Sequence, residues 1–163
     1  MKKNEFDLHL RRKMRLVIQR VSEASVTVDG ECIASIPHGL LILVGVENGD
    51  TGQDADWLAA KTASLRIFDD QDGVMNRSVV DVDGSLLAVS QFTLTASTRK
   101  GNRPSYIRAA GRGLAVPLYE RYCEQLARYA ARPVRQGRFG ADMKVRLLND
   151  GPVTILIDSK LKE

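Results

Sequence analysis

Two short segments carry the residue types from which chemistry could be built. The first, Ser90-Gln91-Phe92-Thr93, places two hydroxyls, an amide and an aromatic ring after an apolar stretch. The second is the Gly151-Pro152 step between two apolar stretches. A cis peptide is one option there, and only about 5–6% of X–Pro bonds in folded proteins are cis, usually as a specific feature. Each segment also has a simpler interpretation, as a strand ending in a polar loop and as a tight turn.

The side chains on which common hydrolases rely are scarce. Of the two histidines, His9 lies near the N-terminus and His38 lies in a Pro-His-Gly turn, so a Ser-His-Asp arrangement is not expected. Cys32 and Cys123 have no metal-ligand spacing and are interpreted as small buried residues in a strand and a helix. The sequence also has no glycine-rich phosphate loop. An enzyme built from this chain would therefore use hydroxyls, backbone groups or groups of its substrate.

Hydrophobic patterning predicts the elements that position these segments. The expected fold is a single α+β domain, mostly antiparallel β in a barrel-like sheet, with two main helices packed outside. Asp29-Gly30 favours a hairpin turn, and the near-continuous apolar run at residues 39–46 predicts a strand buried on both faces. The expected strands are 15–21, 24–28, 32–36, 39–46, 86–92, 143–148 and 153–158, and the expected helices are 54–65 and 116–129.

Length and composition exclude several classes of protein. A chain of 163 residues with 44% hydrophobic and 27% charged residues is typical of one soluble globular domain rather than a disordered chain. The longest apolar stretch, residues 39–46, is far shorter than the roughly 20 residues of a membrane-spanning helix. Two cysteines fit a reducing compartment, so we expect a cytoplasmic protein with no membrane partner.

The formal net charge of +4 is unevenly distributed. Residues 99–138 contain ten basic residues against two acidic ones, a local +8, whereas residues 45–85 contain three basic residues against nine acidic ones, a local −6. Nine of those ten basic residues are arginines, whose planar guanidinium suits phosphate contacts. This segment indicates either a polyanionic partner or a solvated charged face.

The N-terminal 13 residues hold five basic and two acidic side chains, or +3 of the total charge. They lack the apolar core and the cleavage site of a secretory signal. We interpret residues 1–13 as an N-terminal extension, from an upstream start codon or added residues, before a natural-looking start at Met14. A targeting or RNA-contacting arm is the alternative. The expected domain spans residues 14–163.

Five motifs in order resemble the D-aminoacyl-tRNA deacylases of the bacterial and eukaryotic type, from Met14 to about Ser159. Together they are specific, whereas either of the two opening segments alone would not be. Tyr106 stands where phenylalanine is common in that family, and the family begins at the position of Met14. The motifs lie at residues 14–21, 90–94, 100–106, 137–143 and 149–154.

The resemblance implies a homodimer that hydrolyses the ester between a D-amino acid and the 3′-terminal adenosine of tRNA, and also removes mischarged glycine. No metal or organic cofactor is expected. It also implies that Gly151-Pro152 of one subunit reaches into the pocket of the other and that Arg20 holds this motif. The pocket is expected to contain Ser90, Gln91, Phe92 and Thr93, with the adenosine end lined by Ala109, Ala110, Phe139 and Met143.

The chemistry of chirality fits these residues. D and L amino acids exchange a hydrogen and a side chain at one carbon, so rejection of the L isomer needs a rigid wall where its side chain would lie. Backbone carbonyls of a cis Gly-Pro step would form such a wall, and glycine would pass it. For hydrolysis we favour the 2′-hydroxyl of the adenosine as the group that activates water, with backbone N–H groups near Phe92 and Thr93 stabilising the oxyanion. Thr93 as nucleophile is the alternative.

Two other functions remain open from the sequence. The arginines of residues 99–138 would also suit a non-catalytic, dimeric RNA- or DNA-binding module. A trans Gly151-Pro152 peptide would indicate a relative that removes an L-amino acid.

Overall fold

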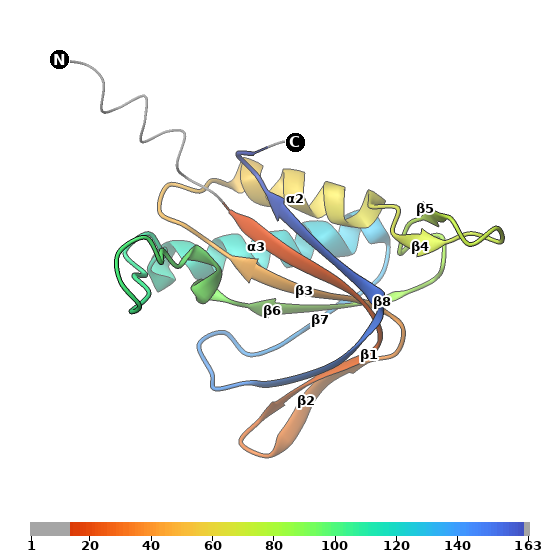
Figure 1. The fold of residues 1–163 in the computed structure, drawn as a ribbon, viewed down its shortest axis with the longest axis horizontal. Coiled ribbons are helices and arrows are strands. Elements are labelled where there is room, and N and C mark those ends of the chain that lie inside the picture. The colour runs from red at the N-terminus through yellow and green to blue at the C-terminus, as the bar shows by residue number, and fades with distance from the viewer. Residues whose placement is uncertain (1–13, 162–163) are drawn as a thin grey trace.

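The computed structural model describes residues 14–161, and the extension expected at residues 1–13 lies outside them. Figure 1 shows two helices packed against a strongly curved sheet, as the sequence predicts. The helices are α2 (Gly52–Ser64) and α3 (Arg112–Ala130), and a short 3-10 helix, η1, spans Phe92–Thr95. The strands are β1 (Arg15–Val28), β2 (Glu31–Ile36), β3 (Gly39–Gly45), β4 (Phe68–Asp69), β5 (Met75–Arg77), β6 (Ser85–Ser90), β7 (Val134–Gln136) and β8 (Lys144–Asp158).

The main sheet is mixed, so the prediction of a mostly antiparallel sheet is only partly right. Its order is β2-β1-β3-β6-β7, and β8 pairs with β1. β1 is antiparallel to β2, β3 and β8, whereas β3 and β6, and then β6 and β7, run parallel. The parallel pairs arise because α2 connects β3 to β6 and α3 connects β6 to β7, and a helical crossover returns the chain in the same direction.

β1 and β8 are long strands that bend together and curl the sheet into a nearly closed barrel (Figure 1). The first half of β1 pairs with β3, and its second half pairs with β2 in a hairpin closed by Asp29-Gly30, which confirms the predicted turn. Predicted strands 15–21 and 24–28 are therefore one strand, as are 143–148 and 153–158. Neither strand ends at these interruptions, because β1 and β8 continue to pair with each other on both sides of each register shift.

Two hydrophobic cores explain the apolar run of β3. Leu40, Ile42 and Val44 face the helices, together with Leu58 of α2 and Tyr122 of α3. Leu41 points to the other side of the strand, into a second core inside the curled sheet. The prediction of a strand buried on both faces is thus confirmed, since successive side chains of β3 enter different cores.

Three local predictions need correction or adjustment. Cys123 is buried as expected, but Cys32 is exposed because it lies on the outer side of β2, at the edge of the sheet. Helix α3 begins four residues earlier than predicted, so Pro117 lies inside the helix rather than in its first turn. There it removes one backbone hydrogen bond to the carbonyl of Gly113.

None of the helices within residues 14–161 is long and apolar enough to cross a membrane.

Candidate active site

A cavity of about 440 Å³ opens where β3 and β6 end and α3 begins. Val44, Val89, Ser90 and Gln91 line it from the two parallel strands and the residue that follows them. Other lining residues come from η1, from the end of the loop before α3, from the first turns of α3 and from the segment between β7 and β8. They include Phe92, Ala110, Arg112, Tyr119, Phe139, Gly140, Asp142 and Met143.

Backbone pairing fixes the Ser90–Thr93 segment at this cavity. Ser90 pairs with Val44 at the end of the parallel ladder, and the Gln91 N–H donates to the Val44 carbonyl at 2.8 Å. The chain then turns into η1, whose first N–H groups, those of Phe92 and Thr93, have no acceptor within the helix. The side-chain amide of Gln91 donates a hydrogen bond to the Thr93 hydroxyl, which does not itself line the cavity.

An aromatic cluster forms another part of the cavity lining. The Tyr119 hydroxyl donates to the Ala88 carbonyl at 3.1 Å, and burial raises the pKa of this phenol, so it remains a neutral donor. The Phe139 ring lies edge-on to Tyr119 at 5.9 Å, and the Arg112 guanidinium lies 5.2 Å from the centre of Phe139. Arg112 and Tyr119 were not predicted as site residues, because their positions at the start of α3 and in its buried stripe did not indicate a cavity.

The Gly151-Pro152 step lies in a bulge of β8 rather than in a turn between strands. Gln19 pairs with Thr154 and Val21 pairs with Asn149, so two steps along β1 correspond to five along β8. The three extra residues push the chain outward, and the Gly151-Pro152 peptide is cis. The sequence left the cis and trans isomers both open at this step.

The side chain of Asn149 closes the base of this bulge. Its Oδ1 accepts the Val153 N–H at 2.8 Å, and its Nδ2 donates to the Val153 carbonyl at 3.3 Å and to Thr154 Oγ1 at 3.1 Å. Asn149 begins the motif at residues 149–154, but its residue type and position alone predicted no role for it. The tendency of asparagine to hydrogen-bond nearby backbone groups was the available signal.

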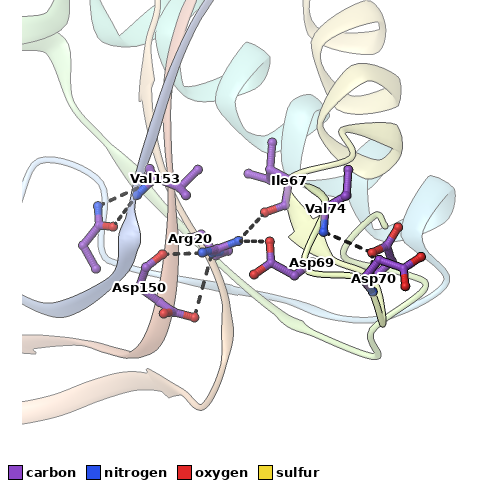
Figure 2. A network of polar contacts seen from close by, with 9 residues as sticks. Arg20, Ile67, Asp69, Asp70, Val74, Asp150 and Val153 are labelled. Carbon is purple, nitrogen blue, oxygen red and sulfur yellow. Dashed lines mark hydrogen bonds and ion pairs between the residues drawn. The ribbon is translucent and has the colours of Figure 1, made fainter. Parts of the chain in front are cut away.

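Arg20 holds the bulge from the other side. Its side chain is buried, with Nε donating to the Asp150 carbonyl at 2.9 Å and Nη1 donating to the Ile67 carbonyl at 2.8 Å. The Asp69 carboxylate lies 3.4 Å from the same Nη1. Figure 2 shows Arg20 between the bulge of β8 and the segment that carries Ile67 and Asp69. Arg20 thus contacts the residue that precedes Gly151, and its role in holding the Gly151-Pro152 motif stays a prediction.

The expected site residues form two groups within one chain. Ser90, Gln91, Phe92, Ala110, Phe139 and Met143 line the cavity, whereas Gly151, Pro152 and Arg20 do not. Thr93 and Ala109 adjoin lining residues without lining the cavity themselves. Within residues 14–161, no cluster of three or more His, Cys, Asp or Glu side chains is arranged to hold a metal ion.

The segment that carries Ala109 and Ala110 is held by residues that follow β3. The Ala110 N–H donates to the Val46 carbonyl at 3.0 Å, and Ala109 pairs with Glu47 in an isolated bridge. Glu47 is buried, and its own N–H donates to Asp50 Oδ2 at 2.7 Å. Backbone contacts of Val46 and Glu47 thus hold one wall of the cavity, and the buried Asp50 carboxyl in turn binds the Glu47 N–H.

Burial raises the pKa of the Asp50 carboxyl from 3.8 to about 7, and the nearby charges of Asp54 and Glu47 act in the same direction. Because folded Asp50 binds its proton more tightly than the unfolded chain does, its contribution to stability is lost as pH rises from about 4 to about 7. Asp50→Asn keeps an acceptor for the Glu47 N–H. Relative to wild type, its free energy of unfolding should therefore increase by on the order of 2 kcal/mol between pH 4.5 and pH 8, after allowance for solvent screening.

Urea unfolding at a series of pH values measures this difference. Asp56→Asn is the control, since Arg121 lowers the pKa of that exposed carboxyl and its titration falls below the same window. Parallel stability profiles for wild type and Asp50→Asn would contradict the prediction.

Comparison with known proteins identifies the family. The model of the D-Tyr-tRNA(Tyr) deacylase family matches residues 17–158. A D-aminoacyl-tRNA deacylase of Bacteroides fragilis (strain YCH46) is 59% identical over 150 residues, covering 92% of this chain and 100% of its own. One from Flavobacterium johnsoniae is 58% identical with the same coverage. The chain belongs to the D-Tyr-tRNA(Tyr) deacylase family, which confirms the resemblance found in its motifs.

A solved structure also matches closely. The c-Myc DNA Unwinding Element Binding Protein is 40% identical to this chain and superposes with a TM-score of 0.83, covering 88% of this chain and 97% of that one. The fold is thus shared by proteins whose names describe different roles.

Proposed function

We propose that this protein hydrolyses the ester between a D-amino acid and the 3′-terminal adenosine of tRNA, as a proofreading step of translation. The observation that carries the proposal is that one cavity is lined by Ser90, Gln91, Phe92, Phe139 and Met143. The chain that forms this cavity belongs to the deacylase family. A volume of about 440 Å³ lies in the range of small-molecule sites and suits a nucleoside with an attached amino acid.

Two parts of the cavity lining suit the two parts of this ligand. Phe139, flanked by Tyr119 and Arg112, offers an aromatic face and a guanidinium to a purine ring. The Ser90–Thr93 segment offers backbone N–H groups to the ester carbonyl, which becomes negatively charged in the transition state. The ester is therefore assigned to η1 and the adenine to Phe139.

The wall that rejects L-amino acids is assigned to the partner subunit of a homodimer. Gly151 and Pro152 are exposed on β8 and do not line the cavity of their own chain. Leu148 and Leu156, on either side of the bulge, are exposed by 56% and 65%, an apolar surface of the kind that dimers cover. In a two-fold dimer each bulge would enter the neighbour's cavity, and mischarged glycine, having no side chain, would be accepted.

Substrate assistance is the mechanism that the site favours. No histidine of the described residues lies at the cavity, and Thr93 hydrogen-bonds to Gln91 rather than to a basic group. An unassisted threonine hydroxyl is a weak nucleophile. The 2′-hydroxyl of the terminal adenosine would then position the attacking water beside the ester.

Removal of that 2′-hydroxyl is expected to lower the single-turnover rate at least 100-fold, whereas Thr93→Ala should retain activity within about tenfold of wild type. The comparison uses D-Tyr-tRNA ending in 3′-linked 2′-deoxyadenosine or in adenosine. An acyl-enzyme that accumulates with wild type and disappears with Thr93→Ala would assign the nucleophile to Thr93 instead.

Purified protein incubated with D-Tyr-tRNA and L-Tyr-tRNA decides between this function and the alternatives. Release of tyrosine from the D ester alone is the expected result. Release from the L ester alone would indicate the opposite specificity.

A non-catalytic nucleic-acid-binding module is a second candidate. It is favoured by the name of the c-Myc DNA Unwinding Element Binding Protein, which is 40% identical to this chain, and by the basic segment at residues 99–138. Binding of intact tRNA without hydrolysis of either ester would support this candidate over the deacylase.

A further inference from the structure

The sequence from residue 84 to residue 119 contains no aspartate or glutamate, and it includes the loop between η1 and α3. This loop projects at one end of the molecule, beside η1 and the start of α3 (Figure 1). It carries four basic residues, Arg99, Lys100, Arg103 and Arg108. A basic loop at the mouth of a site for an RNA end is placed to meet the rest of that RNA.

The basic side chains of this loop divide into two kinds. Arg108 is structural, because its Nη2 donates to the Thr95 carbonyl at 3.4 Å and its Nε lies 3.9 Å from Glu47 Oε1. Arg99, Lys100 and Arg103 are exposed and make no hydrogen bond or ion pair with any other described residue. These three cations are therefore available to a ligand, unlike Arg121 or Arg132, which bind carboxylates.

The loop has a fixed base rather than loose ends. Ser97 and Ser105 exchange two backbone hydrogen bonds of 2.8 and 2.9 Å, which close the seven residues between them. Tyr106 follows this bridge, and its ring packs edge-on against Phe92 with centroids 5.1 Å apart. Phe92 lines the cavity, so the aromatic pair connects the cavity to the basic loop.

Both rings are accessible. Phe92 is 57% exposed and Tyr106 is 40% exposed, and Ile107 beside them is 83% exposed. Single-stranded nucleic acid is commonly bound by exposed aromatic rings beside unpaired cations. The bases stack on the rings, and the phosphates contact the cations. Every tRNA ends in unpaired CCA, so two nucleotides immediately precede the adenosine assigned to the cavity.

We propose that the Phe92–Tyr106 pair and the loop cations Arg99, Lys100 and Arg103 bind the two unpaired nucleotides that precede the terminal adenosine. The proposal rests on the proposed function, because it extends the path of the same substrate beyond the cavity. The bases stack on the aromatic pair, and the phosphodiesters contact the three cations.

Tyr106→Ala tests the stacking. Its kcat/KM for D-Tyr-tRNA is expected to fall about tenfold, while its kcat/KM for D-tyrosyl-adenosine stays within about twofold of wild type. Tyr106→Phe keeps the ring and should behave as wild type. Tyr129→Ala is the matched control, since Tyr129 is 53% exposed near the other end of α3. An equal loss with both substrates would overturn the proposal.

The three cations are tested together by the triple variant Arg99→Ala, Lys100→Ala and Arg103→Ala. Loss of three phosphate contacts to a single strand should reduce the slope of log affinity against log salt by about two. The probe is a fluorescent, non-acylated RNA ending in CCA, measured by anisotropy. An unchanged slope would remove the phosphate contacts from the proposal.

The same probe separates failure of this proposal from failure of the proposed function. Oligonucleotide binding that depends on Tyr106, without ester hydrolysis, would refute the deacylase and retain this surface. Hydrolysis of the tRNA ester that is unaffected by Tyr106→Ala would refute this surface and retain the deacylase. If Tyr106→Ala changes the oligomeric mass in sedimentation but not RNA binding, the surface covers another copy of the chain and the proposal is wrong.

Discussion

Gly151→Ala is expected to lower D-aminoacyl-tRNA hydrolysis at least 100-fold while the protein remains folded. Gly151 has a φ of +137°, where side chains are strained, and an added Cβ would lie 2.8 Å from Val153 Cγ2 and 3.0 Å from Arg20 Nη2. The backbone of the bulge must shift to relieve these contacts, and a displacement of about 1 Å in a positioning group can cost about 100-fold in rate. Single-turnover hydrolysis of D-Tyr-tRNA measures the loss.

Gly73→Ala is the matched control. Gly73 also has a positive φ, +75°, but a Cβ there would meet nothing within 4 Å, and the residue lies in the turn between β4 and β5. Both variants carry backbone strain, so only a loss specific to Gly151→Ala concerns the site. Equal activity of the two variants would show that the bulge has no part in hydrolysis.

Mixed dimers show in which subunit the bulge acts. Gly151→Ala impairs the bulge and leaves the cavity intact, whereas Phe139→Ala impairs the cavity and leaves the bulge intact. If the bulge serves the partner, subunit exchange between the two inactive variants should restore about one quarter of wild-type activity, because half of the dimers then contain one complete site. If the bulge serves its own chain, the mixture should stay inactive.

Arg20→Ala is expected to produce the largest loss of stability, about 2–4 kcal/mol in the free energy of unfolding. The substitution leaves the carbonyls of Ile67 and Asp150 without their donor and removes the partner of Asp69. Activity should fall as well, since Asp150 adjoins Gly151. Urea unfolding gives the stability, and hydrolysis is assayed at a temperature where the variant is folded.

Two further variants separate geometry from charge. Arg20→Lys keeps the charge, but a single ammonium cannot reproduce the fork that reaches both carbonyls, so most of the loss should persist. Arg121→Ala removes an exposed guanidinium that binds Asp56 through two hydrogen bonds, and its unfolding midpoint should barely change. A comparable destabilisation by Arg20→Ala and Arg121→Ala would contradict the role given to burial.

Backbone pairing brings some of the predicted site residues together at the cavity, and their roles stay predictions. Ser90 ends the buried strand β6 and Gln91 follows it, and the parallel partner β3 ends at the same place, so the pairing of these two strands brings both residues to the cavity. Phe139 and Met143 were assigned by resemblance, and both line that cavity. Arg112 and Tyr119 were missed because a helical stripe reveals which face is buried but not where the packing leaves a void.

The sequence by itself determined the two helices, the doubly buried strand, the hairpin at Asp29-Gly30 and the family, because these depend on periodicity, turn chemistry and ordered motifs within short stretches. Only the tertiary structure decided that β8 continues through Gly151-Pro152 as a bulge, since that outcome depends on pairing with β1 on both sides of it. The tertiary structure also decided which arginines bind other groups of the protein and which remain exposed. Arg108, Arg121 and Arg132 bind groups distant in sequence, whereas Arg99 and Arg103 remain exposed, a difference that no local count of charge contains.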